Sequence, residues 1–210
     1  MYVRNHMIRA SMLTVVTPED NVRVALEKIN SGDFLSIPVV KDNQIYGILM
    51  KEAIYRYYFQ NGYSSKEDFL ENCLVEELCN KEFETIKSYD RVDKASHLLN
   101  SARTPFLAAV DRDGRFEGIL THSSIFNAFS EVFGFDSGER IVVHMFDIPG
   151  QLARLTDLLR KEKINIVNLT VLDAKVMGVV RVILRLDIDN PEYIMEKIQN
   201  AGFKIGEVGN

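Results

Sequence analysis

Two short clusters of polar residues in this sequence have the chemistry needed to recognise a small molecule. In the first cluster, Thr121, His122 and Ser124 follow an apolar run and precede residues at helical spacing. Hydroxyl groups and backbone amides at the start of a helix complement anionic oxygens. The same hydroxyls are equally suited to capping that helix, because their oxygens accept from free backbone amides. The sequence alone leaves the two interpretations evenly balanced.

The second cluster combines Asp147 and Gly150, in the segment Asp-Ile-Pro-Gly, with Asn165 at the start of a later apolar run. The Asn165 amide can donate to a carboxylate and also accept from an ammonium group. Asp147 could instead cap a helix that begins at Pro149, and we favour this interpretation for it. For Asn165 the question stays open.

Other kinds of site are not indicated. His6, His97, His122 and His144 are scattered, and the spacing of Cys73 and Cys79 fits neither a zinc knuckle nor a redox pair. The sequence contains no phosphate loop, nucleophile elbow or dinucleotide fingerprint. We therefore expect no catalytic residues, no metal site and no cofactor, and a protein that is not an enzyme.

Composition excludes several partners. The net charge is -5, with 25 basic and 30 acidic residues mixed along the chain, so we expect no direct contact with nucleic acid. No run of about 18 apolar residues occurs, and the N-terminal residues lack a charged segment followed by an apolar one. These features predict a cytoplasmic protein with reduced thiols, neither exported nor inserted in a membrane.

These clusters belong to a sequence that contains one pattern twice, about 70 positions apart. The three apolar positions of a predicted helix in the first copy recur in the second: Val22, Ala25 and Ile29 correspond to Val92, Ala95 and Leu99. The offset then grows by one, so that Gly47 corresponds to Gly118, and one extra turn residue in the second copy explains this. A repeat shows which positions are equivalent and where two copies can share a site.

Each copy has the order β-α-β-β-α, predicted from helical spacing and from apolar runs around a polar turn. In the first copy we expect a short strand at 14–16, a helix at 21–31, strands at 34–40 and 45–50, and a helix at about 51–60. The short strand of the second copy is expected at 85–86. Residues 61–72 join the copies, and a short connecting helix starts near Ser65.

This pattern resembles the cystathionine-beta-synthase (CBS) domain, which occurs in tandem pairs called Bateman modules. The resemblance rests on the repeated helix, on Ile37-Pro38-Val39-Val40, and on the Gly-Ile-Leu segment before each last helix. It implies two repeats, 1–62 and 73–134, whose paired sheets leave two clefts that bind adenosine-containing ligands. The cleft with the better match to the family's Gly-x-x-Ser/Thr-x-x-Asp motif is expected to contain Arg9, Thr14, Ser36, Ile37, Pro38, Thr121, His122 and Ser124.

The other cleft departs from that motif. Met50 and Ala53 stand where a hydroxyl and an aspartate are usual, and in the better cleft Ser124 replaces the aspartate. We expect no ligand beside Met50, although Arg103 could still hold a phosphate there, or two chains could share a bulkier ligand.

The residues after 138 predict the order βαββαβ, following a glycine-spaced linker at 133–138. We expect strands at 140–146, 165–173, 176–187 and 203–208, with helices from 149 to about 163 and from 191. With Asp-x-Pro-Gly-x-Leu at the first turn, residues 139–210 resemble an ACT domain, a regulatory module with a ferredoxin-like fold. The resemblance implies an amino-acid site at a dimer interface, at Asp147, Gly150 and Asn165. The fold class is thus α+β throughout.

The combination is similar to the CBS-ACT proteins related to the acetoin-utilisation accessory protein of bacteria. We expect a non-enzymatic regulatory protein, a homodimer, whose repeats bind AMP, ATP, S-adenosylmethionine or a cyclic dinucleotide and whose last domain binds an amino acid. The alternative is an assembly module with degenerate pockets that acts through dimerisation. The regulated partner protein cannot be identified from the sequence.

Overall fold

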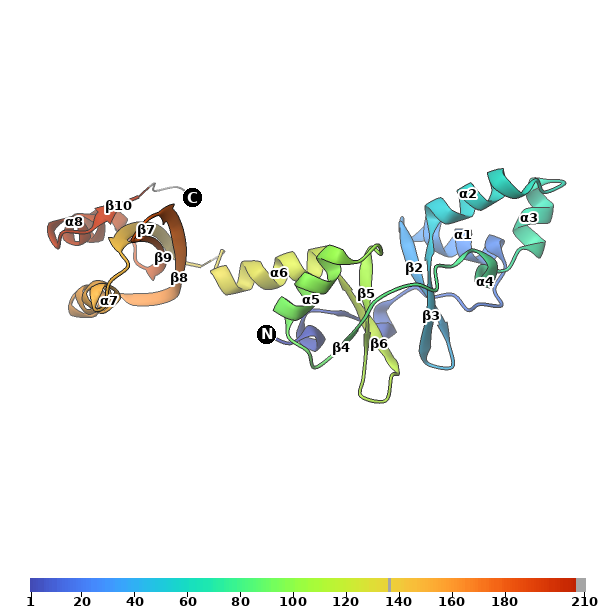
Figure 1. The fold of residues 1–210 in the computed structure, drawn as a ribbon, viewed down its shortest axis with the longest axis horizontal. Coiled ribbons are helices and arrows are strands. Elements are labelled where there is room, and N and C mark those ends of the chain that lie inside the picture. Colours follow the sequence, from blue (N-terminus) through green and yellow to red (C-terminus); the bar gives the residue numbers. More distant parts are fainter. Residues whose placement is uncertain (136, 207–210) are drawn as a thin grey trace. The chain divides into compact units, whose positions relative to one another are not determined.

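The computed structural model describes residues 1–135 and 137–206. The chain forms two compact units, Met1–Ala128 and Phe129–Asn210, whose elements are labelled in Figure 1. The prediction of a mixed α+β fold with a further sheet after the repeats is confirmed. Within the described part of the chain, no helix is both long and apolar enough to cross a membrane.

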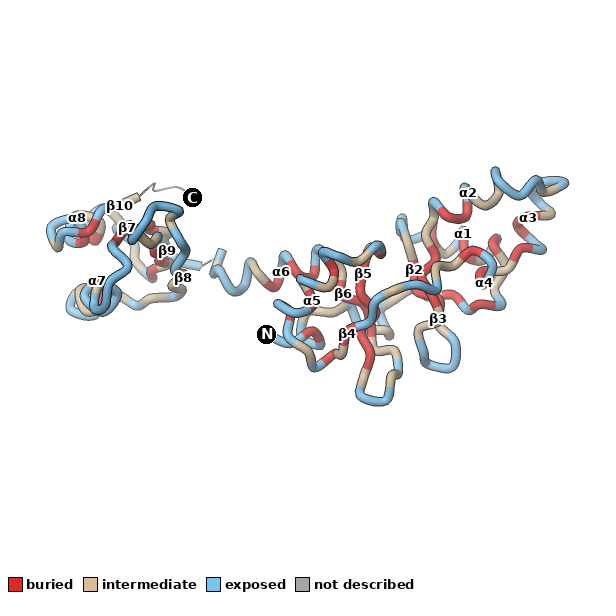
Figure 2. Tube along the Cα trace, viewed as in Figure 1, coloured by how far each residue is buried: buried red, intermediate tan, exposed pale blue. Residues whose placement is uncertain are grey.

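The first repeat is a hairpin covered by helices on one side (Figure 1). Its elements are η1 (Val3–Asn5), β1 (Ile8–Arg9), η2 (Ala10–Met12), α1 (Val22–Ser31), β2 (Ser36–Lys41), β3 (Gln44–Met50), α2 (Lys51–Asn61), α3 (Lys66–Asn72) and α4 (Val75–Leu78). The Asn21 side chain caps α1 by accepting from the Val24 amide at 3.1 Å. Ala25 and Ile29 of α1 pack with Val39 and Leu49 of the hairpin in one buried core, and Figure 2 shows these buried faces.

The predicted strand at 14–16 is wrong. Only Val16 pairs, through an isolated parallel bridge in which its amide donates to the Pro38 carbonyl and its carbonyl accepts from the Val40 amide. The next bond of the ladder would need an N–H from residue 38, which proline lacks. In the second repeat the equivalent residue is Ala108, and there the strand forms, pairing Thr85 with Ala108.

The second repeat has the same architecture. Its elements are β4 (Thr85–Lys87), α5 (Val92–Ser101), β5 (Phe106–Val110), β6 (Phe116–Thr121) and α6 (His122–Phe133), the last of which runs past the end of the first unit. The two hairpins have register shifts at equivalent places, after Val39 and after Ala109.

The two hairpin turns differ in length. In the first, Asp42 and Asn43 both have positive φ, 51° and 61°, as a two-residue turn requires. In the second, the Asp111 amide donates to the Arg115 carbonyl at 2.9 Å around a longer loop. The extra turn residue predicted from the sequence is confirmed.

Each repeat contributes a segment to the sheet of the other, which the sequence did not predict. β1 pairs with β6, so the second sheet has the order β1-β6-β5-β4, and Asn80 forms a bridge with Ile48 in the first. A glycine permits each close approach. A Cβ on Gly118 would lie 2.2 Å from the Ile8 carbonyl oxygen, and a Cβ on Gly47 would lie 2.9 Å from the Cys79 sulfur.

An apolar cluster joins the repeats. Its buried members are Ile48, Phe106 and Ile119, and the residues that pack against them are Leu13, Met50, Phe83 and Phe116. Ile48 and Ile119 occupy equivalent positions in the two copies, as do Leu13 and Phe83. The repeats therefore pack through corresponding surfaces.

The second unit is an antiparallel sheet with two helices on one face. Its elements are β7 (Glu139–Phe146), α7 (Gln151–Lys161), β8 (Asn165–Val176), β9 (Val179–Asp187), α8 (Pro191–Asn200) and β10 (Lys204–Ile205). The strand order is β10-β7-β9-β8. Leu155 and Leu159 of α7 pack with Ile194 and Ile198 of α8 against Val182 and its neighbours in the core.

Some boundaries in this unit differ from the predictions. The second strand continues to Val176, and the third begins at Val179 after a tight turn through Gly178, whose φ is 71°. The last strand covers only Lys204–Ile205 among the described residues, and positions 207–208 of the predicted strand lie outside them. Of the predicted linker at 133–138, residue 133 belongs to α6 and residue 136 lies outside the described residues.

Candidate functional site

The first candidate site begins where β6 ends and α6 starts. The Thr121 hydroxyl accepts from the Ser124 amide at 3.1 Å and lies 3.0 Å from the Ser124 hydroxyl. The capping interpretation of Thr121 is therefore confirmed. Ser124 is buried, Thr121 is half-buried and His122 is exposed. The α6 N-terminus carries partial positive charge, and the Thr121 hydroxyl remains a polar group beside it.

The equivalent helix start in the first repeat has lost its polar character. Met50 precedes α2 without a side-chain cap, and it packs against the apolar cluster between the repeats. Phe106, which corresponds to Ser36, is 2% exposed in that same cluster. Met50 and Phe106 thus place apolar side chains where the other cleft has Thr121 and Ser36.

The first repeat is expected to supply the opposite wall of the candidate cleft. Ser36 is half-buried and pairs with Met50 in the hairpin, and Thr14 is half-buried in the segment before Val16. The Pro38 carbonyl already accepts from the Val16 amide at 3.2 Å. Among the described residues, no hydrogen bond joins Thr14 or Ser36 to Thr121.

Two predicted residues lie less favourably than expected. The Ile37 side chain is 2% exposed and belongs to the core of the first repeat, so a purine cannot lie against it without rearrangement. Arg9 alternates with Ile8, whose register partner Ile119 faces the inter-repeat cluster. Arg9 therefore projects from the other face of the edge strand. Within the described residues it has no ion-pair partner.

The second candidate site lies at the end of the sheet in the second unit. Gly150, with φ of 88°, is the N-cap residue of α7, and no side chain caps this helix. The interpretation of Asp147 as a cap for a helix beginning at Pro149 is therefore wrong. Glycine adopts the left-handed backbone that this helix start requires without steric cost. The Asp147 carboxylate remains exposed and free of a capping role.

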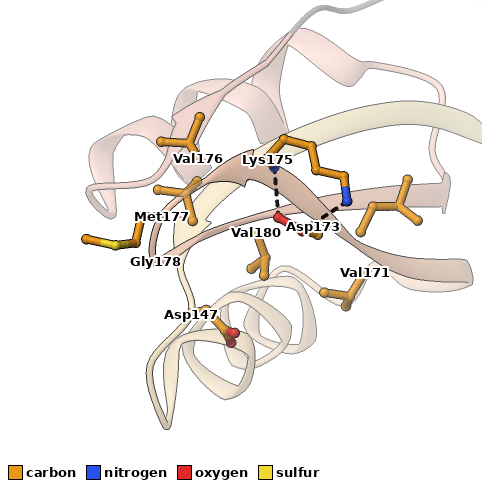
Figure 3. A pocket seen from close by; sticks show the side chains of 10 residues that line it. Asp147, Val171, Asp173, Lys175, Val176, Met177, Gly178 and Val180 are labelled. Carbon is orange, nitrogen blue, oxygen red and sulfur yellow. Dashed lines mark hydrogen bonds and ion pairs between the residues drawn. The ribbon is translucent and has the colours of Figure 1, made fainter.

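Asp147 lines a cavity of about 480 Å³ under the β8–β9 hairpin. Its walls include Val171, Val176 and Val180, which Figure 3 shows on the hairpin above Asp147. Lys175 is paired with Asp173 at 3.2 Å and does not neutralise Asp147. The exposed Asp147 carboxylate lines this cavity together with the valines and the ion pair of Lys175 with Asp173, and it can accept from an ammonium group. The apolar members were not predicted as site residues, because their alternation indicates only a strand.

Asn165 lies far from Asp147 in the same chain. Phe146, just before Asp147, is paired with Val179 at one end of β9, whereas Asn165 is paired with Asp187 at the other end. At a rise of ~3.3 Å per residue, these ends are about 26 Å apart. One chain therefore brings together Asp147 and Gly150 but not Asn165.

Neither site includes a metal centre. In the described part of the sequence, no group of three or more His, Cys, Asp or Glu residues is arranged to hold a metal ion. Burial raises the pKa of the Cys73 thiol, and also that of Cys79, which disfavours the thiolate forms that bind metals.

Comparison with known proteins identifies the repeats. The family described as CBS domain matches residues 4–60 and again residues 75–131. Solved structures with the same fold include a CBS domain-containing protein of unknown function from Bacillus anthracis, 25% identical with a TM-score of 0.55, covering 62% of this chain and 94% of that one.

Two similar structures contain ligands. CbpB from Listeria monocytogenes in complex with c-di-AMP is 25% identical, with a TM-score of 0.54, covering 63% of this chain and 98% of that one. CBSX2 in complex with AMP is 22% identical, with a TM-score of 0.54, covering 62% of this chain and 97% of that one, a likeness of fold alone; CBSX2 comes from Arabidopsis thaliana.

Proposed function

The chain belongs to the CBS-domain family, and on this premise we propose that its repeat pair binds an adenosine-containing ligand in the cleft beside Thr121. The observation that carries the proposal is the asymmetry of the two helix starts. Thr121 is a half-buried hydroxyl at the N-terminus of α6, whereas Met50 at the equivalent place is packed among apolar side chains. A phosphate is favoured at the first position and excluded at the second.

The ligand contacts follow from the two walls. Backbone amides of the first turn of α6 and the Thr121 hydroxyl would take phosphate oxygens, while Ser36 and Thr14 would take ribose or base. Arg9 lies on the edge strand β1, and its side chain projects from the face away from the apolar cluster between the repeats. It would therefore have to extend past β1 to reach the phosphate. The c-di-AMP complex of CbpB supports an adenine nucleotide as the ligand class, and AMP, ATP and S-adenosylmethionine are further candidates.

Thermal unfolding with AMP, ATP, S-adenosylmethionine and c-di-AMP tests this proposal. At 100 times Kd, a ligand that binds only the folded state stabilises it by about 2.7 kcal/mol. We expect a shift with one of the four that is lost in Thr121→Ala. Ser65→Ala is the matched control, because the Ser65 hydroxyl caps α3 by accepting from the Asp68 amide at 3.0 Å, away from the cleft. Absence of any shift at millimolar ligand would overturn the proposal.

A ligand that contacts both repeats stabilises whichever arrangement completes its site, which is how binding would regulate a partner. The protein would then be a non-enzymatic cytoplasmic regulator. We assign the repeats to 1–62 and 73–134 and the last domain to 139–210.

A second candidate function is assembly without a ligand. It is favoured by Phe106 and Met50, which fill one cleft, and by exposed aromatic side chains on α2, where Phe59 is 81% exposed and Tyr55 is 48% exposed. Exposed aromatic patches of this kind mark protein interfaces. A sedimentation coefficient that changes with nucleotide would exclude this alternative.

We also propose that residues 139–210 are an ACT domain, as in the CBS-ACT proteins related to the acetoin-utilisation accessory protein. The element order βαββαβ and the strand order β10-β7-β9-β8 support a ferredoxin-like fold. β8 is a long edge strand, and such an edge is suited to pairing with another chain.

Antiparallel pairing of β8 with its copy in a homodimer would carry Asn165 of the partner subunit toward the end of the sheet that holds Asp147. An amino acid could then meet a carboxylate from one chain and an amide from the other. Calorimetric titration with amino acids tests this site. Binding that is lost in both Asp147→Asn and Asn165→Ala supports it, and binding insensitive to both contradicts it.

A further inference from the structure

The second unit contains another cavity, of about 580 Å³, on the side of β7 and β9 next to β10. Cavities of ~300–1,000 Å³ are the usual size of small-molecule sites. Its lining combines apolar, neutral and basic side chains, which are His144, Met145, Phe146, Gln151, Arg154, Ala174, Val176, Val179, Arg181, Gly202, Phe203 and Lys204.

The arginine and lysine side chains in this lining form no ion pair with a carboxylate in the described part of the chain. Arg154 stacks over the Phe203 ring at 5.3 Å and donates to the Ala201 carbonyl and to the Gln151 side chain. Arg181 and Lys204 form no ion pair with any residue that the structure describes. Three uncompensated cations around one cavity are unexpected in a chain with a net charge of -5, and they favour an anionic occupant.

The lining also indicates that the occupant has no ammonium group. Among the residues that the structure describes, no Asp or Glu lines this cavity, so an ammonium group would face Arg154, Arg181 and Lys204 without a counter-charge from them. Phe146, Val176 and Val179 offer apolar surface, and Phe146 is 66% exposed, so a bare inorganic anion would leave that surface unused. The adjacent cavity shares Val176 and Val179 but has the opposite charge, because Asp147 lines it.

We propose that this cavity binds a small organic carboxylate with an aromatic or branched apolar body and no ammonium group. Arg181 and Lys204 hold the carboxylate, and Phe146 with Val179, on the same face of the sheet as His144 and Arg181, holds the apolar body. The site is independent of the nucleotide cleft and of the residues Asp147, Gly150 and Asn165.

Calorimetric titration of the full chain with three probes tests the proposal. These are 3-phenylpropanoate, phenylalanine, which differs from it only by the ammonium group, and inorganic phosphate. We expect saturable binding of 3-phenylpropanoate, and at least tenfold weaker binding of the other two. Equal affinity for phenylalanine would overturn the exclusion of the ammonium group, and equal affinity for phosphate would overturn the role of the apolar wall.

Variants locate the site. Arg181→Gln and Lys204→Gln are each expected to weaken 3-phenylpropanoate binding by about tenfold or more, since each removes a charged hydrogen-bond donor. Lys163→Gln is the control, because it removes one positive charge from the same unit outside the cavity lining. Two lining variants are used so that the other still tests the site if one of them fails to fold. Unchanged affinity in both, or no saturation by 3-phenylpropanoate at ~10 mM, contradicts the proposal.

Discussion

Replacing Thr121 with aspartate separates the two roles that its hydroxyl can have. Aspartate is as good an N-cap as threonine, and its carboxylate can accept from both the amide and the hydroxyl of Ser124, which now contact Thr121 at 3.1 and 3.0 Å. The free energy of unfolding should therefore change by less than about 0.5 kcal/mol. Thr121→Val removes the cap and should cost about 1 kcal/mol.

Thr121→Asp is expected to weaken ligand binding although it leaves the free energy of unfolding nearly unchanged. A carboxylate about 5 Å from a phosphate repels it by about 3 kcal/mol at an effective dielectric constant of ~20. This energy weakens binding by roughly a hundredfold. The variant Thr121→Asp should thus fold like the wild type and fail to bind the nucleotide, whereas Thr121→Ser should retain both properties.

Two assays make the comparison, namely urea unfolding for stability and calorimetric titration with the nucleotide that stabilises the wild type. If Thr121→Asp binds that nucleotide with wild-type affinity, the Thr121 hydroxyl does not lie beside an anionic group and serves only as a cap. If Thr121→Asp is destabilised as much as Thr121→Val, the capping role assigned to the side chain at position 121 is wrong.

Three further predictions concern packing and the thiols. Gly118→Ala should destabilise the first unit by about 1–3 kcal/mol in urea unfolding, since its Cβ would lie 2.2 Å from the Ile8 carbonyl oxygen; a change under ~0.5 kcal/mol would refute the close crossing of β1. Phe106→Ala should cost about 3–5 kcal/mol by the same assay, because Phe106 is 2% exposed between the repeats, and a cost under 1 kcal/mol would show that the cluster does not join them. Cys73 and Cys79 should react slowly with a thiol reagent at pH 7.5 in the folded protein, since burial raises the pKa of both thiols; reaction as fast as in urea would contradict this.

The helices and hairpins of the repeats could be predicted because their apolar residues recur with clear periods. The position of Val22, Ala25 and Ile29 on one buried face follows directly from that spacing. The one-residue difference between the two turns could also be predicted, because the offset between the copies grows by one across the hairpin.

What could not be predicted depends on contacts between distant segments. β1 has only two residues and therefore no period, yet it crosses to the other repeat. The absence of a strand at 14–16 depends on Pro38 in the neighbouring strand. Asp147 and Asn165 were expected in one site, but the strand register places them at opposite ends of β9 within a chain. The cation-lined cavity combines five elements or their loops, and its members share no motif.

Mass spectrometry of the natively purified protein tests the central proposal most directly. We expect a co-purifying adenine nucleotide in the wild type that dissociates on unfolding, and the same protein without it when Thr121 is replaced by Asp. A wild-type protein that carries no nucleotide, and that also binds none of AMP, ATP, S-adenosylmethionine or c-di-AMP when they are added at millimolar concentration, would contradict it.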